Sequence, residues 1–264
     1  MLSEIIAKVV EGENLSRDDA YAAMTAIMRG EATDAQIGAF LVALRMTGET
    51  AEQIGGFARA MRESSLRVHC AHPNLVDTCG TGGDTLDTFN ISTAAALVTA
   101  AAGVPVAKHG NRSVSSRCGS ADVLKELGVR IDLQPAEVEI CLDEVGIGFL
   151  FAPTHHPAMK YAIGPRRELG LRTVFNILGP LTNPAGATRQ VLGVFAPELT
   201  ELMAEALADL HSAHALVVHG MDGLDELSTL GETRVTEMRA GAIETRLITP
   251  EQFGIRRARA EQIA

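Results

Sequence analysis

The chain has 264 residues, of which 46% are hydrophobic and 21% charged, so it can bury a sizeable core and is not an intrinsically disordered chain. Its formal net charge of −10 argues against non-specific binding to nucleic acid, because a phosphate backbone binds a basic face. That charge is still compatible with a locally basic pocket for a small anion.

The cysteines and the apolar runs indicate where the protein resides. The four cysteines are spaced irregularly and form no Cys-x-x-Cys pair, which favours reduced thiols over a zinc site or a disulfide framework. The N-terminus has no signal-peptide pattern, and the longest apolar stretch, 94–107, is too short to span a bilayer. We therefore predict a cytoplasmic protein with no membrane contact.

Residues 1–72 are predicted to form a small all-helical N-terminal domain. Ser16, Thr33 and Thr50 each precede an Asp or Gln by three positions, which is the signature of a capped helix start. Four short helices follow from this pattern, and packing or dimerisation is favoured over direct chemistry as their role. Their expected core contains Ile37, Phe40, Leu41 and Leu44.

Residues 73–264 are predicted to form a larger α/β domain with a mostly parallel sheet flanked by helices, because short β-rich runs alternate with helical ones. A basic, helical-looking tail is expected near residues 256–259. The expected strands are 75–77, 104–107, 130–133, 147–151, 191–195, 213–219, 233–238 and 243–248, and the expected helices are 92–102, 119–127, 135–145, 157–169 and 198–210. Ligands of such sheets bind at the carboxyl ends of the strands, so the segments that follow strands 75–77, 104–107 and 213–219 should meet at one edge.

The first of these segments is a glycine loop, 80–84, followed by a helix that opens at 90–93. Glycines let the backbone approach an anion, and the free amides of a helix start point at it. The loop matches neither the Walker A pattern nor Gly-x-Gly-x-x-Gly, and a simple tight turn is the alternative interpretation. Ser92 could ligate a hard cation through oxygen.

The second segment, 108–116, combines two cations, a histidine, an asparagine and three serines, which favours polyphosphate binding over a structural loop. In the third, Asp225 and Glu226 follow a buried strand. Adjacent acids are common on exposed turns, but acids beside a diphosphate need an intervening metal such as Mg²⁺. Cys79 is a candidate nucleophile by position alone, and packing is the favoured role.

A fourth segment runs from Ala152 to Pro184. His155 and His156 project apart and lack soft partners, which argues against zinc. Arg166 could bind a carboxylate with two parallel hydrogen bonds, whereas Arg167 and Glu168 are expected to form a structural ion pair. The loop 178–184 could form the wall of an aromatic pocket.

The sequence closely resembles the anthranilate phosphoribosyltransferase family of tryptophan biosynthesis. The runs that carry the resemblance are Asp77–Asp84, Phe89–Thr93, Lys108–Leu124, Ala152–Lys160, Arg166–Pro184 and Asp222–Glu226. The resemblance implies a nucleoside phosphorylase/phosphoribosyltransferase-like fold. It also implies transfer of a phosphoribosyl group from 5-phospho-α-D-ribose 1-diphosphate to the amine of anthranilate, the second step from chorismate to tryptophan. Mg²⁺, with two ions per subunit, is the implied cofactor.

The resemblance also implies the site residues. The phosphoribosyl-diphosphate site would comprise Gly80, Gly83, Asp84, Thr88, Asn90, Ile91, Ser92, Thr93, Lys108, His109, Gly110, Asn111, Arg112, Ser113, Val114, Ser115, Ser116 and Ser120. Anthranilate would contact Gly80, Asn111, Arg166, His109 and His156. Magnesium would be held by Ser92, Asp225 and Glu226. No catalytic nucleophile is expected, and Lys108 and Arg166 would act as electrostatic and positioning groups.

Partners and alternatives complete the sequence-based expectations. The family implies a homodimer through the N-terminal helices, and a glutamine amidotransferase of anthranilate synthase is a candidate partner. Family members typically continue beyond residue 264, so we expect a C-terminally incomplete α/β domain. A pyrimidine-nucleoside phosphorylase-like enzyme and a non-catalytic nucleic-acid-binding relative are the alternatives.

Overall fold

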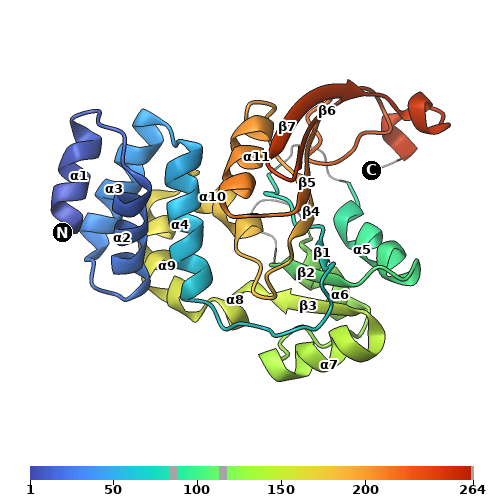
Figure 1. Cartoon of the computed structure of the whole chain (residues 1–264), viewed down its shortest axis with the longest axis horizontal. Helices are drawn as coiled ribbons and strands as arrows, with labels where there is room; N and C mark the ends of the chain where they lie inside the picture. The colour runs from blue at the N-terminus through green and yellow to red at the C-terminus, as the bar shows by residue number, and fades with distance from the viewer. Residues whose placement is uncertain (84–87, 113–117, 263–264) are drawn as a thin grey trace.

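The computed structural model describes residues 1–83, 88–112 and 118–262. A bundle of helices at the N-terminal end stands beside a twisted sheet that is flanked by further helices (Figure 1). No described helix combines the length and the apolar character needed to cross a membrane.

The N-terminal bundle begins with four helices: α1 (Leu2–Val10), α2 (Arg17–Met28), α3 (Asp34–Thr47) and α4 (Ala51–Glu63). The predicted caps are confirmed. The Ser16 side chain accepts a hydrogen bond from the amide of Asp19. Thr33 and Thr50 form complete capping boxes with Gln36 and Gln53. Each hydroxyl satisfies a backbone donor that the first helical turn leaves without a partner, which fixes where the helix begins.

The predicted helical core is also confirmed, and it continues into the rest of the molecule. The four apolar side chains expected at the centre are at most 1% exposed, and the rings of Phe40 and Phe57 meet edge to face at 5.9 Å. Helix α9 (Lys160–Leu169) packs against α2 and α3, and α10 (Phe175–Leu178) packs against α4. Because Ala162 and Leu178 belong to the same hydrophobic cluster as Phe40, later chain segments share the core of the bundle.

Within the described residues, seven strands form one sheet in the order β3-β2-β1-β4-β5-β6-β7. The first five strands run parallel, whereas β6 and β7 add an antiparallel hairpin at one edge, so the predicted mostly parallel sheet is confirmed. The strands are β1 (Val76–Asp77), β2 (Val106–Gly110), β3 (Ile147–Phe151), β4 (Arg189–Gly193), β5 (His214–Gly220), β6 (Thr233–Arg239) and β7 (Ala242–Ile248).

Helices cover both faces of the sheet. Helix α11 (Leu199–Asp209) packs on β5 and β6 and touches α4, so it lies between the sheet and the N-terminal bundle (Figure 1). Helix α5 (Ile91–Ala101) contacts β2, and α7 (Pro135–Val145) contacts β3. The shorter elements are α6 (Ser120–Glu126), α8 (Ala152–His155) and the 3₁₀ turns η1 (Pro157–Met159), η2 (Gly179–Leu181), η3 (Pro250–Phe253) and η4 (Ala260–Gln262).

Two sequence-based expectations about elements are wrong. The expected strand at 130–133 pairs with no described strand. Ile131 is buried against Phe149 and Phe151, so the alternation reflects one-sided burial without a hydrogen-bonded ladder. The expected helical tail is irregular at 255–259, because Gly254 ends η3 in a left-handed conformation and the amide of Ala258 donates to the carbonyl of Thr229.

Candidate active site

The three segments expected at one edge of the sheet lie together there. The amide of Thr81, in the glycine loop, donates to the carbonyl of Gly193 at the end of β4. The carboxylate of Asp225 accepts a hydrogen bond from the amide of Gly82. Lys108 of β2 reaches Thr78 and Ser92. Parallel strands bring these segments together, because their carboxyl ends share one edge.

The glycine loop depends on close backbone approach. Gly82 and Gly83 have φ values of +64° and +90°, a left-handed conformation that side-chain-bearing residues rarely adopt. A Cβ on Gly80 would lie 3.0 Å from the carbonyl oxygen of Gly193. A Cβ on Gly193 would collide with the carbonyl oxygen of Asp225. The glycines therefore hold the loop, β4 and the acid pair in contact, while Asp84 lies outside the described residues.

Lys108 is the buried cation of the site, with only 3% of its surface exposed. Its Nζ donates to the Thr78 hydroxyl at 3.2 Å, to the Thr78 carbonyl at 3.5 Å and to the Ser92 hydroxyl at 3.2 Å. The Thr78 hydroxyl in turn donates to the carbonyl of Ser92 at 2.9 Å. These bonds place a positive charge between the end of β1 and the first turn of α5, where helix amides already favour an anion.

Asp77 lies beneath the loop and was not singled out in the sequence. It is 1% exposed and accepts hydrogen bonds from the amide of His109 at 3.1 Å and from the Asn183 side chain at 2.7 Å. Burial raises the pKa of Asp77 to about 6, against the opposing effects of Asn183 and of the positive charge on Lys108. Asp77 therefore fixes β2 and the loop 178–184 relative to β1.

Two buried histidines face each other in the predicted acceptor pocket. The rings of His109 and His156 are 5.1 Å apart, and within the described structure neither Nε2 atom has a hydrogen-bond partner. Burial lowers the pKa of His109 well below its ordinary value and that of His156 to about 4, so both rings are neutral near pH 7. Nδ1 of His109 lies 3.1 Å from the carbonyl oxygen of Gly179, in the predicted wall loop.

Arg166 lies partly buried on α9, with its guanidinium 5.0 Å from the ring centre of Phe175. Burial lowers its pKa, and no carboxylate in the described part of the chain forms an ion pair with it. Its predicted neighbours Arg167 and Glu168 are exposed, and the expected ion pair between them is absent from the described structure. Arg166 is thus available to an external anion, and no hydrogen bond within the described residues links it to Asn111.

The other predicted phosphate-site residues surround the start of α5 and α6. Asn90 is the N-cap of α5 and its side chain donates to the carbonyl of Cys118 at 3.0 Å. Thr93 carries a buried hydroxyl that lacks a hydrogen-bond partner in the described structure. The Ser120 hydroxyl donates to the carbonyl of Asn111 at 3.3 Å, while Arg112 lies 3.6 Å from Asp122. Thr88, Ile91 and Gly110 lie along the same segments, and residues 113–116 fall outside the described residues.

The acid pair suits a hard cation. Burial raises the pKa of Asp225, against the hydrogen bond from Gly82 and the nearby His219. An ionised carboxylate in such a place gains from a cation beside it. Ser92, Asp225 and Glu226 supply only oxygen donors, the ligand type that Mg²⁺ prefers. In the structure Ser92 is engaged by Lys108, so a metal would share that hydroxyl with the lysine.

Comparison with known proteins decides the family. Residues 72–264 match the model of the glycosyl transferase family, a/b domain, and residues 3–65 match its helical bundle domain. The chain is 59% identical over its whole length to the anthranilate phosphoribosyltransferases of Pelotomaculum thermopropionicum and Moorella thermoacetica, and it covers 76% and 78% of those proteins. The chain belongs to the anthranilate phosphoribosyltransferase family. The family predicted from the sequence is therefore confirmed.

Solved structures of anthranilate phosphoribosyltransferases have the same fold. The enzyme from Thermus thermophilus superposes with a TM-score of 0.91 at 48% identity, over 98% of this chain and 77% of that one. The Saccharomyces cerevisiae enzyme in complex with PRPP and Mg superposes with a TM-score of 0.90 at 30% identity, over 100% of this chain and 76% of that one. The predicted fold class is confirmed.

In this member of the anthranilate phosphoribosyltransferase family, Arg172 is a site residue that the sequence reasoning missed. Its guanidinium donates to the carbonyl of Gly83 at 2.9 Å and stacks 4.3 Å from the ring centre of Phe195. Gln190 is a second site residue that the sequence did not indicate. Its side chain donates to the carbonyls of Pro180 and Cys79, so it links the loop 178–184 to the start of the glycine loop. Gln190 directly precedes the expected strand 191–195 and lies within β4 only in the structure, so no pattern in the sequence marked it.

Proposed function

We propose that the chain transfers a phosphoribosyl group from 5-phospho-α-D-ribose 1-diphosphate to the amine of anthranilate, giving N-(5-phosphoribosyl)anthranilate and diphosphate. The observation that carries this proposal is the convergence of the glycine loop, Lys108 and Asp225 at one sheet edge. It occurs in a chain 59% identical to anthranilate phosphoribosyltransferases. The phosphorylase-like and nucleic-acid-binding alternatives are not favoured.

The diphosphate end of the donor substrate would bind between the glycine loop and the start of α5. The backbone amide of Gly83, the helix N-terminus and the Lys108 ammonium are the positive groups there. Ser92, Asp225 and Glu226 would hold Mg²⁺, with two ions per subunit as part of this proposal. A bound Mg²⁺ would supply charge neutralisation for the diphosphate oxygens.

The acceptor would bind beside His109, His156 and Arg166. The guanidinium of Arg166 has no carboxylate partner in the described structure and is oriented by Phe175, so it suits the carboxylate of anthranilate. The neutral histidines offer an uncharged, partly polar surface for an aromatic ring. Their unpartnered Nε2 atoms support a ligand at this position, because buried polar atoms are normally hydrogen-bonded.

The chemistry would follow from electrostatics and orientation without a covalent enzyme intermediate. Breaking the anomeric C–O bond places positive charge on the sugar and negative charge on the leaving diphosphate. Lys108 and the loop amides would stabilise that negative charge where it develops. Arg166 and Asn111 would align the amine for attack. Burial raises the pKa of Cys79 far above neutrality, so this thiol is not a nucleophile near pH 7.

The proposal is tested by mixing the protein with Mg²⁺, anthranilate and phosphoribosyl diphosphate and following the loss of anthranilate fluorescence. We expect loss that requires both the donor and Mg²⁺. A folded protein, verified by circular dichroism, that consumes no anthranilate at high enzyme concentration would contradict the proposal. A parallel incubation with phosphate and a pyrimidine nucleoside tests the phosphorylase alternative, for which we expect no free base.

The homodimer through the N-terminal helices and the docking of a glutamine amidotransferase stay predictions. The exposed side chains of Val10 on α1 and Met46 on α3, at 71% and 82% exposure, support an apolar contact on the helical bundle.

A further inference from the structure

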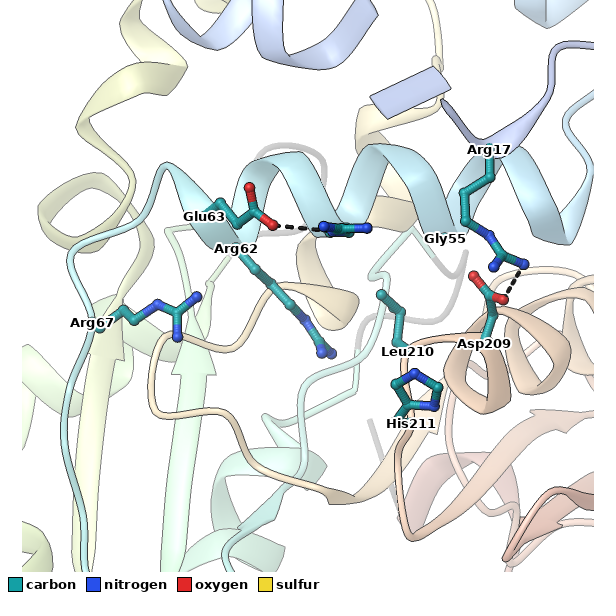
Figure 2. Close-up of a pocket in the computed structure, with 9 residues that line it drawn as sticks. Arg17, Gly55, Arg62, Glu63, Arg67, Asp209, Leu210 and His211 are labelled. Atoms are coloured by element: carbon teal, nitrogen blue, oxygen red, sulfur yellow. Dashed lines mark hydrogen bonds and ion pairs between the residues drawn. The ribbon is translucent and has the colours of Figure 1, made fainter. Parts of the chain in front are cut away.

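A cavity outside the site described above lies between helix α4 and the turn that follows α11. It has a volume of about 320 Å³ and is lined by Arg17, Gly55, Arg59, Arg62, Glu63, Arg67, Asp209, Leu210 and His211. Four guanidiniums and an imidazole thus accompany two carboxylates in a chain whose net charge is −10. Figure 2 shows Arg17, Asp209 and His211 toward one end of this cavity and Arg67 toward the other, with the Arg62 side chain extending between them toward Leu210 and His211.

Both carboxylates of the cavity are already engaged. Asp209 forms an ion pair with Arg17, and Gly55 leaves it the necessary room, because a Cβ there would collide with the carboxylate. Glu63 pairs with Arg59 at 3.0 Å and accepts a hydrogen bond from the Tyr21 hydroxyl. Glu63 also feels the charge of Arg67, but its two oxygens are taken by these partners.

Arg62 and Arg67 are therefore positive groups without an ion-pair partner in the described part of the chain. Arg62 is largely buried, and its Nε donates to the carbonyl of Leu181 at 2.6 Å. That bond uses one of five N–H donors and leaves the terminal nitrogens free to bind an anion. Burial of Arg62 and the positive charge of the nearby, exposed Arg67 lower the pKa of Arg62 to about 10.

We propose that this cavity is an anion-binding site for the phosphate group of a small phosphorylated molecule, held by Arg62 and Arg67. The planar guanidinium fork matches the oxygens of a phosphate, and an anion between the two arginines would relieve their mutual repulsion. The volume fits one small ligand. The site differs from the proposed donor site, which lies at the carboxyl edge of the sheet.

The cavity and the proposed acceptor pocket are both in contact with the turn η2. Leu181, which accepts from Arg62, belongs to the η2 turn, and the carbonyl of Gly179 in that turn contacts His109. An anion that draws the Arg62 guanidinium toward itself would act on the same turn that forms the wall of the acceptor pocket. The connection gives phosphate at this cavity a path to anthranilate binding, and this extension depends on the proposed function.

The test uses a local probe that does not depend on activity. Protein with ¹³C-labelled histidine is titrated with inorganic phosphate, against sodium chloride of matched ionic strength, and the His211 imidazole signal is assigned with the variant His211→Gln. We expect a saturable shift of that signal with phosphate and none with chloride. Arg67→Gln, an exposed substitution that should not disturb folding, should raise the midpoint about tenfold through loss of a charge-assisted hydrogen bond.

Arg29→Gln is the matched control, since it removes one exposed arginine outside the cavity and should leave the midpoint unchanged. Arg62→Gln should weaken the phosphate response as Arg67→Gln does, with circular dichroism reporting whether the fold is kept. No saturable His211 shift, or equal midpoints for Arg67→Gln and Arg29→Gln, would overturn the anion site. Failure of the anthranilate assay alone would leave the anion site standing and count only against the proposed function.

Discussion

At the scale of single residues, the site combines charged groups that form no ion pair within the described part of the chain. Arg166 stacks on Phe175, and the Lys108 ammonium donates to hydroxyl and carbonyl oxygens of described residues. Asp225 is a half-buried carboxyl, and its partial burial raises its pKa. Groups of this kind are costly to fold, so their presence together at one edge supports substrates and metal as their counter-charges.

Arg166→Ala should raise the KM for anthranilate on the order of 10- to 100-fold, more than it raises the KM for phosphoribosyl diphosphate, because it removes a charged hydrogen-bond donor. Steady-state kinetics by the fluorescence assay measures both constants. Arg167→Ala on the same helix is the control, since that side chain is exposed. A larger change in the KM for the donor would contradict the assignment of Arg166.

Arg172→Ala should raise the KM for phosphoribosyl diphosphate more than the KM for anthranilate. The arginine holds the carbonyl of Gly83 and stacks on Phe195, so its loss should loosen the glycine loop. We expect the KM for phosphoribosyl diphosphate to rise about tenfold, as for loss of a hydrogen bond to a charged group, with a smaller effect on anthranilate. Arg172→Lys, which keeps the charge without the planar stack, should recover only part of the loss. Equal effects on both substrates would count against this role.

The raised pKa of Asp77 predicts that the free energy of unfolding depends on pH. Because its pKa in the folded protein is about 6, above the ordinary 3.8, the folded state holds the proton more tightly than the unfolded state. Its contribution to stability is therefore fully present below about pH 4 and is lost as the pH rises through 6. Relative to Asp77→Asn, the wild type should lose on the order of 3 kcal/mol across that window. Urea unfolding at several pH values measures the difference, and a flat difference would refute it.

At the scale of elements, N-terminal capping residues fix where the helices of the bundle begin, and glycines allow the close backbone contacts of the glycine loop. Thr50 and Gln53 exchange hydrogen bonds of 3.3 Å and 3.0 Å at the start of α4. Gly193 brings β4 against Asp225 in a way that no other residue allows. The capping box is local and can be predicted from the sequence. The requirement for glycine at 193 depends on contact with a residue more than thirty positions away.

Thr50→Ala should lower the free energy of unfolding by about 1 kcal/mol, because an amide of the first turn loses its acceptor. Thr50→Ser is the control and should stay within a few tenths of a kcal/mol of the wild type, since it keeps the hydroxyl. Urea unfolding followed by circular dichroism gives both values. Equal losses in the two variants would show that the threonine methyl group, rather than the cap, is responsible.

At the scale of the whole molecule, one hydrophobic cluster joins the N-terminal bundle, α9, α10 and α11 to the sheet. Residues Phe40, Ala162 and Val217 all belong to it, although they come from distant parts of the chain. The bundle and the sheet therefore support each other, and the turn η2 lies where segments from both converge. This placement explains why the cavity lined by Arg62 and Arg67 and the proposed acceptor pocket contact the same turn.

The predicted homodimer is tested at this scale. We expect light scattering after size-exclusion chromatography to give twice the chain mass of 28.0 kDa. Met46→Glu should shift the protein toward monomer, because it places a charge on an exposed apolar position of α3. Val98→Glu on α5 is the matched control and should remain dimeric. A mass of one chain over a wide concentration range would contradict the dimer.

The sequence by itself determined the local features: the caps at Ser16, Thr33 and Thr50, and the alternation of helices with strands. It also placed Lys108 and Asp225 toward the carboxyl edge of the sheet, although Lys108 lies within β2 and not after the strand as expected. These follow from short-range periodicity and from the rule that parallel strands share a carboxyl edge. The family followed from long ordered motifs. The spurious strand at 130–133 shows the limit of this reasoning, because alternation records burial and not strand pairing.

Only the tertiary structure decided which distant residues meet. Asp77 with Asn183, Arg172 with Gly83 and Arg62 with Leu181 are pairs separated by 106, 89 and 119 positions. No local pattern marks such pairs, since each depends on how α9, η2 and the loops pack on the sheet. The electrostatic character of the site has the same origin, because burial in the folded molecule, and not residue type, sets the pKa values of Asp77, His156 and Arg62.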